Sequence, residues 1–145
     1  MKTSITLLAA TFLCSSCAAV QPHWQQTDGS LDQTRYYVDV NERADFRIVC
    51  SNQRISMSFS DKYGAVRLTA IVMDGQRFED YDFFSIQLRD KGDIDKFQPL
   101  WETLRSAKRI TVIADTTPQK SFELPTSNLA KMLPADVTQC DGQQR

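Results

Sequence analysis

The chain has 145 residues, of which 41% are hydrophobic and 24% are charged. This composition supports a packed core and excludes a globally disordered chain, and the length corresponds to one domain. The 17 basic and 18 acidic side chains nearly balance. The charge therefore offers no electrostatic attraction to nucleic acid or to an anionic membrane surface, and we expect no nucleic-acid partner.

The first residues have the pattern of an export signal. Met1-Lys2-Thr3-Ser4 is a short basic segment, and residues 5–14 form an apolar run of about ten residues. A membrane-spanning helix needs about 20 such residues, so this run is too short to be one. Residues 1–16 are therefore predicted to be a signal peptide.

The residues around Cys17 determine how the exported protein is held. Leu13-Cys14-Ser15-Ser16-Cys17-Ala18 resembles a bacterial lipoprotein signal, although Cys14 stands where leucine is usual. By this resemblance, Cys17 would carry the lipid (palmitate included), and Ala18 would direct the protein to the outer membrane, facing the periplasm. The alternative is ordinary signal-peptidase cleavage after Ala19, which would leave a soluble periplasmic or secreted protein.

Two cysteines remain in the mature chain under either interpretation, Cys50 and Cys140. In an oxidising compartment two cysteines most simply pair, so we predict a Cys50–Cys140 disulfide. The alternative is a pair of buried free thiols.

Residues 17–35 are polar and show no apolar period. We predict a lipid anchor and polar tether there, with Trp24 either contacting a partner or packing back on the domain. A single globular domain is expected over residues 36–140, followed by a frayed tail at residues 141–145.

Strand-like alternation begins at Tyr36 and continues to Arg89. It predicts an antiparallel meander of about five strands, with hairpin turns at residues 51–53 and 74–75. The side chains predicted to face the core are those of Phe46, Ile48, Cys50, Ile55, Met57 and Phe59 in the first half, and of Val66, Leu68, Ala70 and Val72 in the second. Asp80 and Asp82 interrupt the last strand, so a break is expected near Tyr81.

Apolar residues then recur at helical spacing over residues 94–107. We predict a helix that begins with a capping box at Asp95 and Gln98 and has Pro99 in its first turn. A central strand at residues 110–114, a paired strand around Phe122 and a short helix that ends before Pro134 follow. The fold class is α+β: the meander, a helix–strand–strand–short helix unit and one disulfide.

The sequence offers few groups for chemistry. His23, the single histidine, lies in the predicted tether, which excludes Ser-His-Asp and Cys-His catalysis in the domain. No catalytic residue, metal site or cofactor is predicted. One row of polar residues is a candidate for binding a polar ligand across a sheet face, with a solvated face as the alternative: Arg54, Ser56, Ser58 and Ser60.

The densest acidic and aromatic stretch is a candidate partner surface, formed by Glu79, Asp80, Tyr81, Asp82 and Phe83. Its simplest alternative is a solvated strand face. A further alternative is a carboxylate-dependent cell-wall hydrolase, because Asp80 and Asp82 on one strand face would lie about 7 Å apart.

Residues 97–112 (FQPLWETLRSAKRITV), 121–125 (SFELP) and 129–133 (LAKML) resemble the C-terminal half of the invasion-associated locus B family. Its members are small exported bacterial proteins with a β-rich domain, and the resemblance implies a non-enzymatic envelope protein. We therefore expect an exported envelope lipoprotein that acts as a binding or accessory module for another envelope or periplasmic protein. The alternative is a periplasmic immunity-type inhibitor of a toxic enzyme.

Overall fold

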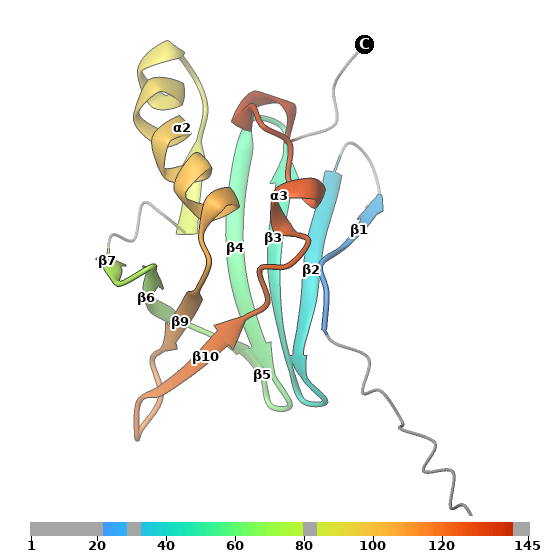
Figure 1. Cartoon of the computed structure of the whole chain (residues 1–145), viewed down its shortest axis with the longest axis vertical. Coiled ribbons are helices and arrows are strands. Elements are labelled where there is room, and N and C mark those ends of the chain that lie inside the picture. Colours follow the sequence, from blue (N-terminus) through green and yellow to red (C-terminus); the bar gives the residue numbers. More distant parts are fainter. Residues whose placement is uncertain (1–21, 29–32, 80–83, 141–145) are drawn as a thin grey trace, which may run out of the picture.

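Two antiparallel sheets make up most of the domain in the computed structural model, which describes residues 22–28, 33–79 and 84–140 (Figure 1). The larger sheet has the order β1–β2–β3–β4–β5, and β8 also pairs with β4. Its strands are β1 (Gln25–Asp28), β2 (Gln33–Asn41), β3 (Ala44–Ser51), β4 (Arg54–Asp61), β5 (Gly64–Val66) and β8 (Ser85–Gln87). The predicted signal peptide, Cys17 and the predicted tail at residues 141–145 lie outside the described residues.

The smaller sheet has the order β10–β9–β6–β7. Its strands are β6 (Leu68–Met73), β7 (Gln76–Phe78), β9 (Ile110–Ala114) and β10 (Lys120–Leu124), and the helices are α2 (Lys91–Ser106), α3 (Leu129–Met132) and the 3₁₀ helix η1 (Val137–Gln139). The central position predicted for residues 110–114 is confirmed, because β9 lies between β10 and β6. The predicted α+β class is confirmed as well.

The alternation in β3 and β4 places one side of each strand in the core, as predicted. Phe46, Ile48 and Cys50 are fully buried, and Ile55, Met57 and Phe59 oppose them across the β3–β4 pairing. Both predicted hairpin turns are present. Asn52, Gln53, Asp74 and Gly75 all have positive φ angles, as a two-residue type I′ turn requires.

An antiparallel meander is present as β1 to β5, but it does not continue through residues 68–78 as the alternation predicted. The chain leaves the larger sheet after β5, and β6 pairs with β9 and β7 in the smaller sheet. A register shift between Leu68 and Ala70 also changes the buried side of β6, so Ile71 and Met73 are buried in place of Val72. The expected break near Tyr81 lies outside the described residues, and the strands on either side of it, β7 and β8, belong to different sheets.

Helix α2 begins one turn earlier than predicted. The Asp90 carboxylate accepts a hydrogen bond from the Asp93 backbone N–H at 3.0 Å, so Asp90 is the N-cap and the capping box assigned to Asp95 and Gln98 is wrong. Pro99 consequently lies inside the helix. The Gln98 side chain instead connects α2 to the chain end: its amide donates to the Ala135 carbonyl and accepts from the Val137 N–H.

The folded part of the chain extends N-terminally of residue 36, where a tether was expected. Trp24 is 1% exposed, its ring packs edge-on against Phe46, and its indole N–H donates to the Pro125 carbonyl at 2.7 Å. The Asn128 side chain accepts from the Trp24 N–H and donates to the Trp24 carbonyl. Residues 22–28 are therefore held against the C-terminal third.

The C-terminal segment crosses one face of the larger sheet and closes the core (Figure 1). The predicted Cys50–Cys140 disulfide is confirmed, and it joins β3 to the residue after η1. Trp101 is fully buried and donates its indole N–H to the Pro134 carbonyl. The Arg105 guanidinium donates to the carbonyls of Leu133 and Ala130, so α2 and the chain end are fixed to each other.

Candidate functional site

The predicted partner surface falls mostly outside the described residues. Of its five members, Asp80, Tyr81, Asp82 and Phe83 are not described, and Glu79 follows β7. The Glu79 carboxylate is exposed and forms an ion pair with Arg77. The proposed clustering of acidic and aromatic side chains therefore stays a prediction.

A groove lies beside Glu79, between strand β7 and helix α2, and we call it the β7–α2 groove. It has a volume of about 490 Å³. Phe78 and Leu100, both half-buried, form its apolar part together with Pro99. Its polar lining consists of Gln76, Glu79, Lys96 and Thr103. Pro99 lies inside α2, a position that the sequence analysis missed.

Strand β7 is an edge strand of the smaller sheet. It pairs with β6 through three register pairs, Ile71 with Phe78, Val72 with Arg77 and Met73 with Gln76. In the described part of the chain no strand pairs with its other side. An unpaired strand edge can accept an additional strand, and apolar pockets beside it can select side chains.

Comparison with known proteins identifies a family for most of the chain. The YfjT family model matches residues 22–133. The chain belongs to the YfjT family. No curated protein and no solved structure gives a significant match. The YfjT region starts just before Trp24 and contains the whole β7–α2 groove. It ends before Cys140, so of the two disulfide cysteines it contains only Cys50. The resemblance to the invasion-associated locus B family is not tested by this finding.

The second surface in the YfjT region is the outward face of the larger sheet, which we call the open face. The row predicted from the sequence, Arg54, Ser56, Ser58 and Ser60, lies there, and each of these side chains is exposed or half-buried. Cross-strand neighbours extend the row: Gln33 pairs with Ser51, Ser51 with Arg54, and Arg54 with Gln87. The predicted polar sheet face is therefore present, and its ligand stays a prediction.

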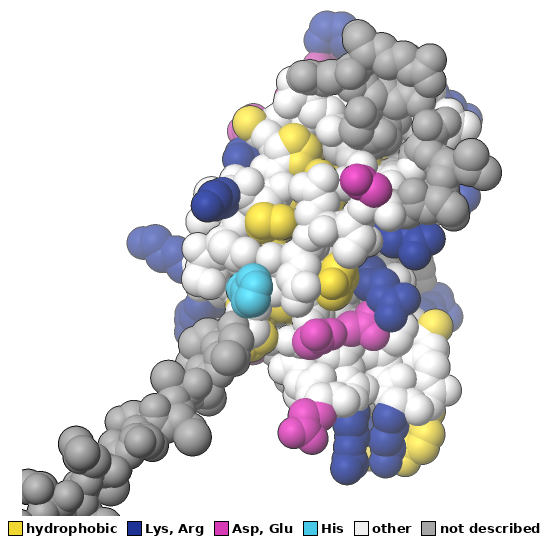
Figure 2. Space-filling view, turned by 90° about the vertical axis from the view of Figure 1, so that its right-hand side faces the viewer, with side chains coloured by type: hydrophobic (Ala, Val, Ile, Leu, Met, Phe, Trp, Pro, Cys, Tyr) yellow, Lys and Arg dark blue, Asp and Glu magenta, His cyan; other side chains and the backbone are white. Residues whose placement is uncertain are grey.

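The side of the molecule that carries β1 and β2 has a mixed surface (Figure 2). In Figure 2, acidic and basic side chains are interspersed there, and hydrophobic side chains are scattered among polar ones. Mixed charge of this kind is typical of a solvated surface. The β7–α2 groove and the open face therefore remain the surfaces of interest.

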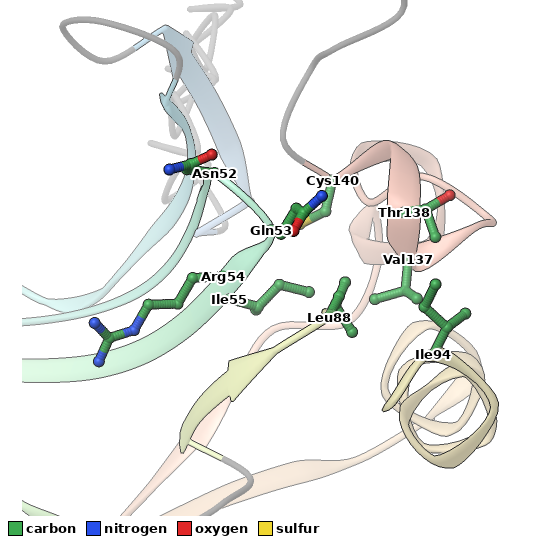
Figure 3. A pocket seen from close by; sticks show the side chains of 9 residues that line it. All are labelled: Asn52, Gln53, Arg54, Ile55, Leu88, Ile94, Val137, Thr138 and Cys140. Atoms are coloured by element: carbon green, nitrogen blue, oxygen red, sulfur yellow. The ribbon is translucent and has the colours of Figure 1, made fainter. Parts of the chain in front are cut away.

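Two hollows flank the β3–β4 turn at one end of the open face. The inner hollow, of about 260 Å³, lies beside the disulfide (Figure 3). Ile55, Leu88, Ile94 and Val137 point into it. Three of these four side chains belong to the buried core. Because small-molecule sites usually enclose about 300–1,000 Å³, this hollow is a small gap at the edge of the core rather than a ligand site.

The outer hollow, which we call the turn pocket, has a volume of about 390 Å³. It is lined by Ser51, Asn52, Gln53, Arg54, Gln87 and Arg89. The Arg54 guanidinium donates to the Ser85 hydroxyl at 2.8 Å, and the Leu88 N–H donates to the Gln53 carbonyl at 2.7 Å. The sequence analysis missed this pocket because it arises from the pairing of β8 with β4, which no local pattern predicts.

The two groups with shifted pKa values, Asp74 and Tyr36, lie outside the groove and the turn pocket. The pKa of Asp74 is lowered because its carboxylate accepts hydrogen bonds from the backbone N–H groups of Lys108 and Arg109. The pKa of Tyr36 is raised by burial and, to a lesser extent, by the charge of Asp28. Neither residue lines the groove or the turn pocket. Within the described residues, no group of three or more His, Cys, Asp or Glu side chains could hold a metal ion, and no helix is long and apolar enough to span a membrane.

Proposed function

We propose that the protein is an exported, non-enzymatic binding module that docks an extended segment of another envelope protein in the β7–α2 groove. The observation that carries the proposal is the pairing of an apolar groove with the edge strand β7. Backbone groups on the edge supply affinity for a partner strand, while the groove selects its side chains.

The lining of the groove suits a peptide better than a small molecule. Phe78 and Leu100 are half-buried, so a partner side chain can remove their remaining surface from water. Lys96 is exposed on the α2 side and Glu79 on the β7 side. A strand with an acidic residue near Lys96 would complement that charge, whereas Glu79 is already paired with Arg77.

The export signal and Cys17 support an envelope location, and we propose an outer-membrane lipoprotein facing the periplasm. Four residues, 18–21, separate the anchor position, Cys17, from Pro22, the first described residue, so five Cα-to-Cα steps join them. Fully extended, they would reach no more than about 18 Å. Because Trp24 belongs to the fold, a lipid on Cys17 would hold the domain close to the membrane rather than on a long tether.

A site-specific photo-crosslinker in the full chain, in cells, tests the docking proposal. We expect a crosslinker at Leu100 to give one discrete product with an envelope protein, and a crosslinker at Ser121, exposed on β10, to give none. Lys96→Glu should abolish the product, whereas the matched surface change Lys120→Glu should leave it. Equal products from both crosslinker positions, or an unaffected product in Lys96→Glu, would overturn the proposal.

The same experiment separates the alternatives. Mass spectrometry of the mature protein reports its first residue, and a mature chain that starts at Val20 would contradict lipidation at Cys17. A crosslinked partner that is a toxic enzyme, inhibited on binding, would support the immunity-type alternative. Turnover of a cell-wall substrate that Asp80→Asn and Asp82→Asn abolish, with the fold intact, would contradict the non-enzymatic function.

A further inference from the structure

The turn pocket has a chemical lining that the proposed docking function does not use. Its side chains comprise two guanidinium groups (Arg54 and Arg89), three amides (Asn52, Gln53 and Gln87) and the Ser51 hydroxyl, and no carboxylate lines it. Its volume of about 390 Å³ falls within the usual range of small-molecule sites. We propose that the turn pocket binds a carboxylate-bearing sugar.

The pocket is built on paired strands, which fixes its side chains relative to one another. Ser51, Arg54 and Gln87 occupy one cross-strand row on β3, β4 and β8. Figure 3 shows the Arg54 and Ile55 side chains leaving β4 on opposite sides, so that Ile55 points toward the core and Arg54 away from it. The strand pairing therefore holds the Arg54 guanidinium between the Ser51 hydroxyl and the Gln87 amide.

Among the described residues, the acidic side chains that follow the pocket in the chain accept hydrogen bonds from backbone N–H groups and form no ion pair with the pocket arginines. The Asp93 carboxylate accepts from the Arg89 backbone N–H, and the Asp90 carboxylate accepts from the Asp93 N–H. The ion pairs of the described residues are Arg47–Asp45, Arg77–Glu79 and Lys91–Asp95. Neither pocket arginine belongs to them, so both guanidinium groups can pair with a ligand carboxylate.

Gln53 occupies a position of the β3–β4 turn that favours glycine. Its φ angle is 63°, in the left-handed region, where a residue with a Cβ atom is disfavoured. A type I′ turn with asparagine first usually has glycine second. Glutamine at this position weakens the turn and adds an amide to the pocket lining.

The amides distinguish a sugar from a simple anion. A free carboxylate can accept hydrogen bonds from the arginines, but it cannot donate to the oxygens of Asn52, Gln53 and Gln87. Sugar hydroxyl groups both donate and accept. Ser56 and Ser85 continue the polar surface next to the pocket, so further units of a glycan would find hydroxyl partners along the open face.

The test compares two sugars that differ in one lactyl ether group, with lactate alone as the control for that group. N-acetylmuramic acid carries a lactyl carboxylate that N-acetylglucosamine lacks, and binding of each to the mature full-length chain, disulfide intact, is measured by titration calorimetry. We expect the acid to bind at least about tenfold more tightly, since a charge-assisted hydrogen bond contributes this much or more. Equal binding of the two sugars, no binding of either, or lactate binding as tightly as the acid would overturn the proposal.

Variants connect the binding to the pocket. Arg54→Gln and Arg89→Gln should each weaken binding of the acid about tenfold or more, while Arg43→Gln, the same change at the exposed β2–β3 turn, should leave it unchanged. Gln53→Gly should weaken binding although it favours the turn, and urea unfolding of the same variant separates a loss of contact from a loss of fold. An unchanged affinity in Gln53→Gly, or an equal loss in Arg43→Gln, would contradict the assignment. Failure of this test leaves the docking proposal for the β7–α2 groove intact.

Discussion

The inner and outer sides of the larger sheet are held in very different ways. On the inner side, the two ends of the described chain are fixed to the core by long-range contacts: Trp24 to Pro125 and Asn128, and Cys50 to Cys140. The outer side carries polar residues that are exposed or half-buried and contact mainly their strand neighbours. The smaller sheet repeats this contrast, with β9 buried centrally and β7 at the edge with three register pairs.

This contrast separates scaffold from candidate surface. Contacts between positions about a hundred residues apart, such as the one between Trp24 and Asn128, stabilise the fold. This role accounts for the side chains that make them. The groove and the turn pocket instead contain exposed polar side chains, such as those of Lys96 and Gln53. Changes on the inner side should therefore unfold the protein, and changes on the outer side should alter binding.

The largest expected effect on the inner side is loss of the disulfide. Cys50 and Cys140 are 90 positions apart, and closing a loop of that length contributes about 4–5 kcal/mol in the chain-entropy model. Replacing both cysteines with serine should lower the free energy of unfolding, measured with urea, by about this amount. The reduced wild type serves as a control and should match the double variant. A loss below about 1 kcal/mol would show that the C-terminal segment is held without the disulfide.

Trp24→Ala tests whether residues 22–28 belong to the scaffold. The indole is buried, contacts Phe46 and donates a hydrogen bond to Pro125. Removing a buried tryptophan typically costs about 3–5 kcal/mol, and urea unfolding should show a loss in this range. Gln26→Ala, at an exposed position of β1, is the control and should change stability little. Equal, small effects of the two variants on stability would show that residues 22–28 act as the tether predicted from the sequence.

Local patterns predicted the hairpins, the buried faces of β3 and β4, and the C-terminal strands, because alternation and turn residues act over a few positions. They did not predict where strands pair over longer distances. The polar residues around Trp24 gave no sign that Pro125 and Asn128 would enclose it. The separation of the sheets depends on β6 meeting β9, about 40 positions later. The turn pocket was missed for the same reason, whereas the serine row that leads to it was found.

Asp74 gives a smaller, pH-dependent test within the smaller sheet. Its carboxylate joins the β6–β7 turn to the backbone of Lys108 and Arg109, and these hydrogen bonds lower its pKa below 3.8. A lowered pKa stabilises the fold above the unfolded-state pKa, and this contribution is lost as the pH falls through the folded-state pKa. Solvent screening keeps the effect small at this exposed site.

Asp74→Asn keeps a residue that tolerates the positive φ angle but removes the charge. We expect the unfolding free energy of the wild type to fall more steeply than that of the variant as the pH is lowered below about 4. Asp39→Asn, an exposed position on β2, provides the matched control. Parallel curves for wild type and Asp74→Asn would contradict a stabilising role for this carboxylate.

Gln53→Gly should produce the smallest change in stability, and its sign is the informative part. Glycine adopts the left-handed conformation without steric penalty, so the variant should unfold at a slightly higher urea concentration, by an amount on the order of 0.5–1 kcal/mol. A gain in stability together with weaker binding of the carboxylated sugar would show that the glutamine at position 53 serves binding. If Gln53→Gly is less stable than the wild type, the glutamine contributes to the scaffold, and the contrast between the inner and outer sides of the sheet fails at the turn pocket.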